Sequence, residues 1–297
     1  MEAVKKIDIH AHAVAFPQYV PIYHSTGTKF PSAEEMIDLY DKVGIERGVL
    51  LPIVSPEHQS TIMTTEATIA LAEQYPDRFV WFCNIDPRMG TAYAHPTYLL
   101  EHYKRLGARG FGELTVPMYA DAPELERIYS ALEELDMPMT IHVSAPHSGR
   151  YGIMDELGLP RIEGILKRHP RLKILGHSQV FWSEISADNN DEIRGGYPKG
   201  KVIPGRIVEL MSRYENLYCD LSAGSGMFAM MRDPEFTVGF FREFSDRILY
   251  GCDICHKNAV HQYTFDEFLT GMRADGSLSE ENYRKIVREN AVKLLSL

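Results

Sequence analysis

The sequence predicts an α/β fold, specifically a (β/α)₈ barrel of the TIM type, from three observations. Short β-rich apolar runs alternate with amphipathic helical patterns along the whole chain. No Pro/Gly/Ser-rich linker or low-complexity stretch interrupts this alternation, and 297 residues lie within the range of one barrel. We therefore expect a single domain over residues 1–297. The alternative is an open, doubly wound sheet, but no Gly-x-Gly-x-x-Gly follows the first run to support a dinucleotide-binding version.

The strand-like runs are short, apolar and rich in β-branched residues, and they are separated by segments long enough for a helical crossover. Parallel strands joined in this way form βαβ units, and eight such units close a barrel. The predicted strands are residues 6–12, 48–53, 79–85, 108–114, 138–143, 172–177, 217–221 and 248–253.

Helices are predicted between these runs from capping signals and from the helical period of apolar residues. Ser32 and Glu35 have the spacing of a capping box at the start of the first helix. Leu125, Ile128 and Leu132 belong to one buried stripe of a later helix. The clearest predicted helices are residues 32–43, 124–135, 161–169, 204–214 and 279–295.

Composition and charge narrow the classes of function. A net charge of -10 without a basic run disfavours a nucleic-acid binder, so small molecules are the expected partners. No apolar run approaches the roughly 20 residues that span a bilayer, and the chain starts without a signal-peptide pattern, so we expect a cytoplasmic protein without a membrane partner. Homo-oligomers are compatible with this composition. Cys252 and Cys255 form a Cys-x-x-Cys pair that lacks the second pair of a structural zinc site.

Asp8-Ile9-His10-Ala11-His12, at the end of the first run, carries the strongest chemical signal. Residues two apart on a strand share a face, so the imidazoles of His10 and His12 are expected to point at one spot. Imidazole nitrogen is a favoured ligand for zinc and similar metals. The pair alone is a weak signal, because a solvated or core-satisfied histidine pair has the same pattern.

Single ligand-type residues lie at the ends of four later runs. They are Glu113, His142, His177 and Asp253. In a barrel the carboxyl ends of the strands carry the chemistry, so these side chains are expected to converge with His10 and His12. Nitrogen and carboxylate ligands together suit zinc, manganese, iron or nickel.

The chain resembles the amidohydrolase superfamily, in particular its amidohydrolase-related branch of metal-dependent hydrolases and decarboxylases. The resemblance covers essentially the whole length and implies a (β/α)₈ barrel. It implies that His10, His12 and His142 are metal ligands, that His177 is a ligand or a catalytic electrophile, and that Asp253 is both a ligand and a proton shuttle. The matching segments are Asp8-Ile9-His10-Ala11-His12, Ile141-His142-Val143, Ile174-Leu175-Gly176-His177, Leu249-Tyr250-Gly251-Cys252-Asp253 and Asn290-Ala291-Val292-Lys293-Leu294-Leu295.

Glu113 departs from the best-known binuclear members, which carry a carboxylated lysine at the strand-four position. Other members use glutamate as the bridging ligand, so Glu113 could hold two metals; the alternative is a structural glutamate in an ion pair. We expect a divalent metal, with Zn²⁺ first and Mn²⁺, Fe²⁺ or Ni²⁺ as alternatives, and one or two ions.

The predicted reaction is metal-dependent hydrolysis of a C–O or C–N bond in a lactone, amide or ester, with a small and anionic substrate. A metal at His10, His12 and Asp253 would lower the pKa of a bound water, and Asp253 would transfer its proton. The alternative implied by the resemblance is nonoxidative decarboxylation of an aromatic or unsaturated acid at the same site. A glutamate bridging two metals would favour hydrolysis, whereas an arginine facing a single metal would favour decarboxylation. A non-catalytic, ligand-binding barrel is the third possibility.

The loops after the fifth to seventh runs combine cationic and aromatic residues, which favours a carboxylate substrate. The expected substrate-binding residues are His147, Arg150, Trp182 and Arg194. Solvated loop charge is the alternative, because Asp188, Asp191 and Glu192 lie in the same stretch. Asp220 and Ser222, at the end of the seventh run, are further pocket candidates.

Overall fold

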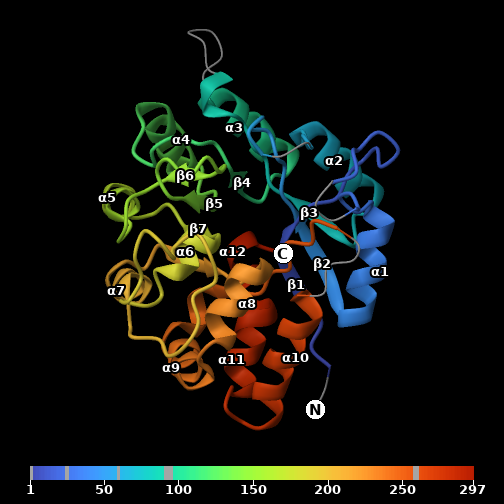
Figure 1. Ribbon diagram of the computed structural model, residues 1–297. Coiled ribbons are helices and arrows are strands. Elements are labelled where there is room, and N and C mark those ends of the chain that lie inside the picture. Colours follow the sequence, from blue (N-terminus) through green and yellow to red (C-terminus); the bar gives the residue numbers. More distant parts are fainter. Residues whose placement is uncertain (1–2, 24–26, 59–60, 90–95, 257–260) are drawn as a thin grey trace.

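The computed structural model describes residues 3–23, 27–58, 61–89, 96–256 and 261–297. In this part of the chain, parallel strands are surrounded by helices, as Figure 1 shows. Two sheets contain the strands, in the orders β1-β2-β3 and β4-β5-β7-β8-β9. The strands are β1 (Lys6–Ala11), β2 (Ile45–Leu50), β3 (Phe79–Trp81), β4 (Phe111–Leu114), β5 (Met139–Ser144), β7 (Ile174–His177), β8 (Leu217–Asp220) and β9 (Ile248–Leu249).

Backbone contacts at both seams join the two sheets into one barrel. Beyond β3, Cys83 forms a parallel bridge with Phe111 of β4. At the other seam the amide of Ile9 in β1 donates to the carbonyl of Tyr250, 3.0 Å away, just after β9. The predicted barrel is therefore confirmed, with one addition: a short strand β6 (Ile153–Met154) pairs with β5 beside the barrel.

The predicted helices are present with small shifts at their ends. Ser32 and Glu35 form both hydrogen bonds of the capping box in front of the first helix. The predicted C-terminal helix is continuous but contains a π-helical turn, Lys285–Glu289. The helices are α1 (Ala33–Val43), α2 (Thr65–Gln74), α3 (Pro96–Leu106), α4 (Pro123–Glu134), α5 (Pro160–Arg168), α6 (Gln179–Ser183), α7 (Arg206–Arg213), α8 (Ala223–Met231), α9 (Pro234–Phe244), α10 (His261–Ala274), α11 (Glu280–Arg284) and α12 (Asn290–Leu295). Among these described helices, none is both long and apolar enough to cross a membrane.

Asp8 ties the first strand to its neighbours at the seam of the barrel. Its buried carboxylate accepts backbone N–H bonds from His10 (2.9 Å) and Cys252 (2.8 Å) and the hydroxyl of Tyr40 on α1 (2.6 Å). Burial raises the pKa of Asp8 to about 6, although these hydrogen bonds oppose the shift. Asp8 therefore holds the backbone of the segment around His10 next to the backbone of the segment around Cys252.

Replacing Asp8 with alanine should lower the free energy of unfolding by about 3 kcal/mol, because three buried donors lose their acceptor at roughly 1 kcal/mol each. Urea unfolding of the purified variant measures this change. The control is Asp38→Ala, which removes an exposed carboxylate on α1 and should change stability by less than about 0.5 kcal/mol. Equal stability of the two variants would contradict the role given to Asp8.

Candidate metal centre

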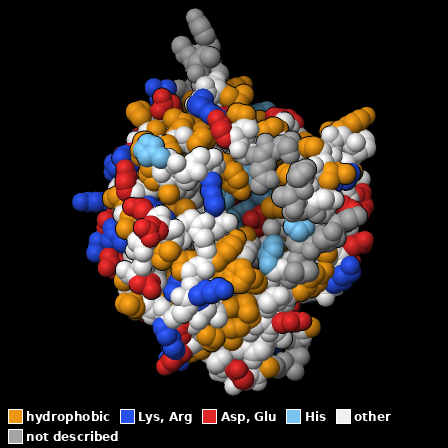
Figure 2. All heavy atoms as spheres, viewed as in Figure 1, with side chains coloured by type: hydrophobic (Ala, Val, Ile, Leu, Met, Phe, Trp, Pro, Cys, Tyr) orange, Lys and Arg blue, Asp and Glu red, His pale blue; other side chains and the backbone are white. Residues whose placement is uncertain are grey.

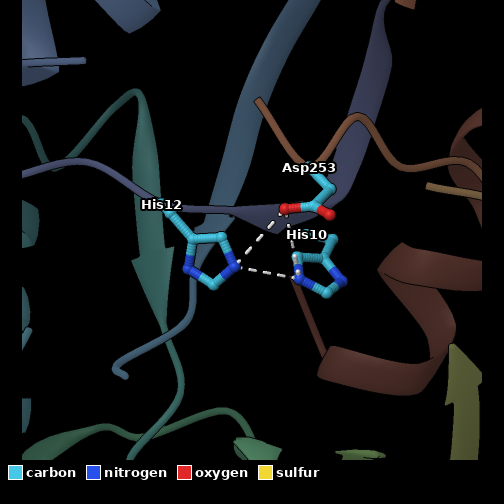
Figure 3. Close-up of side chains that lie close together, drawn as sticks. All are labelled: His10, His12 and Asp253. Atoms are coloured by element: carbon cyan, nitrogen blue, oxygen red, sulfur yellow. Dashed lines mark hydrogen bonds and ion pairs between the residues drawn. The ribbon is translucent and has the colours of Figure 1, made fainter. Parts of the chain in front are cut away.

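Three ligand atoms, from His10, His12 and Asp253, lie within 4.8 Å of one another at the carboxyl ends of β1 and β9, close enough to hold one metal ion. The Nε2 atoms of His10 and His12 lie 3.0 Å apart. Oε2 of Glu113 lies 3.5 Å from the first and 3.4 Å from the second. Oδ1 of Asp253 lies 3.8 Å and 3.5 Å from the same two atoms. Figure 3 shows His10 and His12, from the end of β1, and Asp253, from the segment after β9, pointing toward one another.

These spacings fit a divalent cation. A tetrahedral ion with ligand bonds of about 2.1 Å separates its ligand atoms by about 3.4 Å. Nδ1 of His12 lies 2.9 Å from the carbonyl oxygen of Leu51, which can only accept, so this nitrogen carries the proton. Nδ1 of His10 lies 2.6 Å from the carboxylate of Asp220. Both contacts leave the Nε2 lone pairs directed at the common point, as in metal sites whose ligands are oriented by outer partners.

Glu113 faces a second group of possible ligands with its other oxygen. Its Oε1 lies 2.7 Å from Nδ1 of His142 and 4.0 Å from Nε2 of His177. The side chain is buried between the two groups, and its two oxygens are directed at different imidazole pairs. One carboxylate could therefore serve one cation or bridge two.

His177 lies between Asp220 and Asp253. Its Nδ1 is 3.0 Å from the hydroxyl of Ser222 and 3.7 Å from Oδ2 of Asp220, and its Nε2 is 3.6 Å from Oδ2 of Asp253. Asp253 thus presents one oxygen to His10 and His12 and the other to His177. The thiol of Cys255 donates to the first of these oxygens at 3.2 Å.

The positive and negative groups of the cluster stabilise each other's charged forms, although burial opposes those forms. Burial, the largest influence, would by itself raise the pKa values of Glu113 and Asp253, but His10 together with the neighbouring histidines keeps both below their usual range. Burial opposes a charge on His10, yet Asp220, Asp253 and Glu113 raise its pKa well above the ordinary value. Burial lowers the pKa of His177 to about 4, so its imidazole is neutral at pH 7. The ionised carboxylates and the neutral His177 are suited to bind a divalent cation, and a cation bound at Nε2 of His10 would displace the proton of that imidazole.

The structure brings the six predicted ligand residues into this one network. Figure 2 shows histidine and carboxylate side chains recessed near the middle of the face that it displays. Among the described residues, no Lys or Arg forms an ion pair with the six, which are His10, His12, Glu113, His142, His177 and Asp253.

Two of the predicted substrate-binding residues, Arg194 and Trp182, are buried and bonded to other parts of the protein. Arg194 is buried, and its guanidinium contacts Glu184 (3.5 Å) and Asp191 (3.4 Å), so it stabilises its own loop and a contact with substrate is not supported. The indole of Trp182 is also buried and donates to the carbonyl of Asp220 at 2.9 Å, which makes it a support behind the cluster.

The two remaining predicted residues lie after β5 on an exposed segment. The side chain of Arg150 donates to the carbonyl of Gly195 at 3.0 Å, and His147 has φ 61°. Their role in substrate binding stays a prediction.

Two residues at the site have roles that the sequence did not indicate. Asp220 was a general pocket candidate, and its position at the end of β8 was the available signal; the structure shows that it orients His10. His58, on the segment after β2, is 4 % exposed beside the cluster. Burial lowers the pKa of His58 to about 4, although Glu113 opposes the shift. No spacing pattern marked it, because nothing in its segment shows that the loop folds over the barrel.

Replacing Asp220 with asparagine should weaken cation binding by about 10- to 100-fold, the usual effect of removing a carboxylate that orients a histidine ligand. Competition with a metal-sensitive dye measures the affinity. Asp188→Asn, in an exposed loop, is the matched control and should bind the cation as the wild type does. An unchanged affinity in the Asp220 variant would contradict its orienting role.

Comparison with known structures supports the fold. An uncharacterised TIM-barrel protein from Bordetella bronchiseptica is similar with a TM-score of 0.66 and 18% identity over 99% of both chains. The dihydroxybenzoic acid decarboxylase of a Polaromonas species, solved with manganese and 2-nitroresorcinol, has a TM-score of 0.59 and 20% identity over 99% of this chain and 98% of its own. A probable 2-pyrone-4,6-dicarboxylic acid hydrolase from Acinetobacter baumannii has a TM-score of 0.59 and 14% identity over 99% of this chain and 100% of its own.

A search of curated proteins finds no match. The family described as amidohydrolase matches residues 7–297, which include every residue of the cluster. The resemblance drawn from His10, His12, His142, His177 and Asp253 is thus confirmed at the level of the family. The chain belongs to the amidohydrolase family.

Proposed function

We propose that this protein is a metal-dependent hydrolase that cleaves a C–O or C–N bond in a small lactone, amide or ester. The observation that carries the proposal is the position of Glu113, whose two oxygens face the His10 and His12 pair and the His142 and His177 pair. A carboxylate shared in this way favours activation of water. The absence of an arginine paired with the cluster, among the residues described, also favours hydrolysis over decarboxylation.

A divalent cation bound by His10, His12 and Asp253 would supply a Lewis acid that lowers the pKa of water and polarises a substrate oxygen. Zn²⁺ suits the nitrogen and oxygen donors, and Mn²⁺, Fe²⁺ and Ni²⁺ are alternatives. Asp253 has its second oxygen directed away from the His10 and His12 pair, so it can accept the proton of the attacking water and transfer it to the leaving group. His177, neutral and 3.6 Å from that oxygen, is placed to donate a hydrogen bond to the developing negative charge.

Binding an anionic substrate would need a positively charged side chain near the cluster. Arg194 is already paired with Glu184 and Asp191. Arg150 and His147, exposed on the segment after β5, are the predicted residues that remain available for a carboxylate.

Hydrolysis in ¹⁸O-labelled water tests the reaction class. The metal-loaded protein is screened against panels of lactones, esters and amides, and hydrolysis predicts one ¹⁸O atom in each carboxylate product by mass spectrometry. Activity that requires the cation but releases carbon dioxide without incorporating ¹⁸O would contradict hydrolysis.

Decarboxylation of an aromatic or unsaturated acid is the second candidate. It is favoured by the aromatic rings of Tyr151 and Phe30 beside the cluster, which suit a planar substrate. Similar folds include the dihydroxybenzoic acid decarboxylase described above, which was solved with bound manganese. A screen of hydroxylated benzoates for carbon dioxide release separates this candidate from the first.

A further inference from the structure

Seven rings, including the imidazoles of the candidate metal centre, form a series of neighbours whose last ring contacts the first. Four of them are the histidines of the cluster, and three others complete the series on the side of the loops. Neighbouring ring centroids lie 4.3–6.5 Å apart. In order, the rings are His10, His12, Phe30, His58, Tyr151, His142 and His177, with His177 returning to His10. Phe30 and Tyr151 therefore border the metal ligands, and His58 lies between these two rings.

Tyr151 supplies a ring against which a planar substrate could stack. Its centroid lies 4.6 Å from that of His142 and 4.3 Å from that of His58. The following residue, Gly152, permits this close approach: a Cβ there would lie 2.7 Å from the carbonyl oxygen of His142 and 2.8 Å from its ring. The left-handed φ of 111° at Gly152 also favours glycine. The backbone at Gly152 thus brings the segment after β5 close to His142, with Tyr151 beside the His142 ring.

His58 is the polar member of the three loop rings. Its side chain is buried, and within the described residues its Nδ1 has no hydrogen-bond partner. Buried polar atoms in folded proteins are hydrogen-bonded as a rule, so an exception beside a reaction centre calls for a ligand that supplies the partner. Neutral imidazole can accept a hydrogen bond from a hydroxyl or donate one to a carbonyl.

The backbone around His58 is held independently of its ring. The amide of His58 donates to the carbonyl of Ser55 at 3.1 Å. The neighbouring Glu57 forms a two-oxygen ion pair with Arg88, which also pairs with the buried Asp86. Because these contacts fix the segment from outside, the imidazole nitrogen is not needed to hold the loop.

We propose that His58 is a substrate-binding and specificity residue: its Nδ1 forms a hydrogen bond with an oxygen substituent of an unsaturated ring that packs on Tyr151. The substrate class is a planar ring with a hydroxyl or carbonyl group, whose reacting carbonyl or carboxyl group lies at the metal ligands. This inference rests on the proposed function, because the cation holds one end of the substrate.

The test is calorimetric binding of benzoate and of 2-, 3- and 4-hydroxybenzoate to the cation-loaded protein. The carboxylate suits the cation, the ring suits Tyr151, and the hydroxyl samples the positions that His58 could reach. We expect at least one hydroxybenzoate to bind about tenfold more tightly than benzoate, the worth of one hydrogen bond. His58→Phe keeps a flat ring without nitrogen and should abolish this preference, while benzoate affinity stays within about twofold.

Two further variants control the experiment. His58→Asn places an amide near the position of Nδ1 and should retain part of the preference. His102→Phe, an exposed histidine on α3, should bind all four probes as the wild type does. The proposal is overturned by a wild type without any preference for a hydroxyl group, by a His58→Phe variant that keeps the preference, or by a variant that loses benzoate and cation together. Cation content is measured before any probe is added. A wild type without a cation would contradict the proposed function, and this result is distinguishable from a failure of the role given to His58.

Discussion

Replacing Asp253 with asparagine should lower kcat/KM by about 10³-fold, because the amide cannot accept the proton of the attacking water. The amide oxygen can still occupy the position of Oδ1, 3.5 Å from Nε2 of His12, so the fold and some cation binding should persist. Steady-state kinetics on a substrate found by the screen, with cation content measured on the same preparation, gives both quantities.

Asp188→Asn is the matched control for this change, since it alters an exposed carboxylate in a loop. Its kinetics and cation content should equal those of the wild type. Full activity of the Asp253 variant with its cation in place would exclude Asp253 as the proton shuttle. A variant that loses activity only to the extent that it loses the cation would assign Asp253 a ligand role alone.

Removing both His10 and His12 by alanine substitution should weaken cation binding by at least about 10⁴-fold. Loss of one orienting partner of a histidine ligand typically costs about 10- to 100-fold, and here two direct ligands are lost. The remaining donors, His142 and His177, face the other oxygen of Glu113. Equilibrium dialysis against the cation measures the loss.

Circular dichroism and thermal unfolding show whether the double variant is folded. His102→Ala, on the exposed side of α3, controls for the loss of a histidine and should bind the cation normally. A folded double variant that binds the cation as tightly as the wild type would place the site elsewhere.

The barrel and the six cluster residues could be predicted from the sequence because each depends on a local pattern. The capping box at Ser32 and Glu35 forms as its spacing indicates. A ligand-type side chain at the end of a strand needs only the strand to be identified, since parallel strands of a barrel bring their carboxyl ends together. His10, His142, His177 and the other cluster residues follow that rule.

Other features depend on contacts between distant segments and leave no local signal. Arg194 was expected at the substrate because it is a cation in a loop, but Glu184 precedes it by ten positions and pairs with it only after the loop folds. The helix α8 carries two glycines and an apolar surface without a clear stripe, so it was not predicted. His58 is likewise buried beside the cluster in a loop whose neighbouring residue, Glu57, pairs with the distant Arg88.

The most direct measurement is elemental analysis of the purified protein after expression and dialysis with added Zn²⁺ or Mn²⁺, beside the His10→Ala/His12→Ala variant. The account predicts at least one tightly held divalent ion per chain in the wild type and almost none in the variant. A wild type that is folded but metal-free after this treatment, or a double variant that retains the same ion content, would contradict the claim that the strand ends form a metal centre.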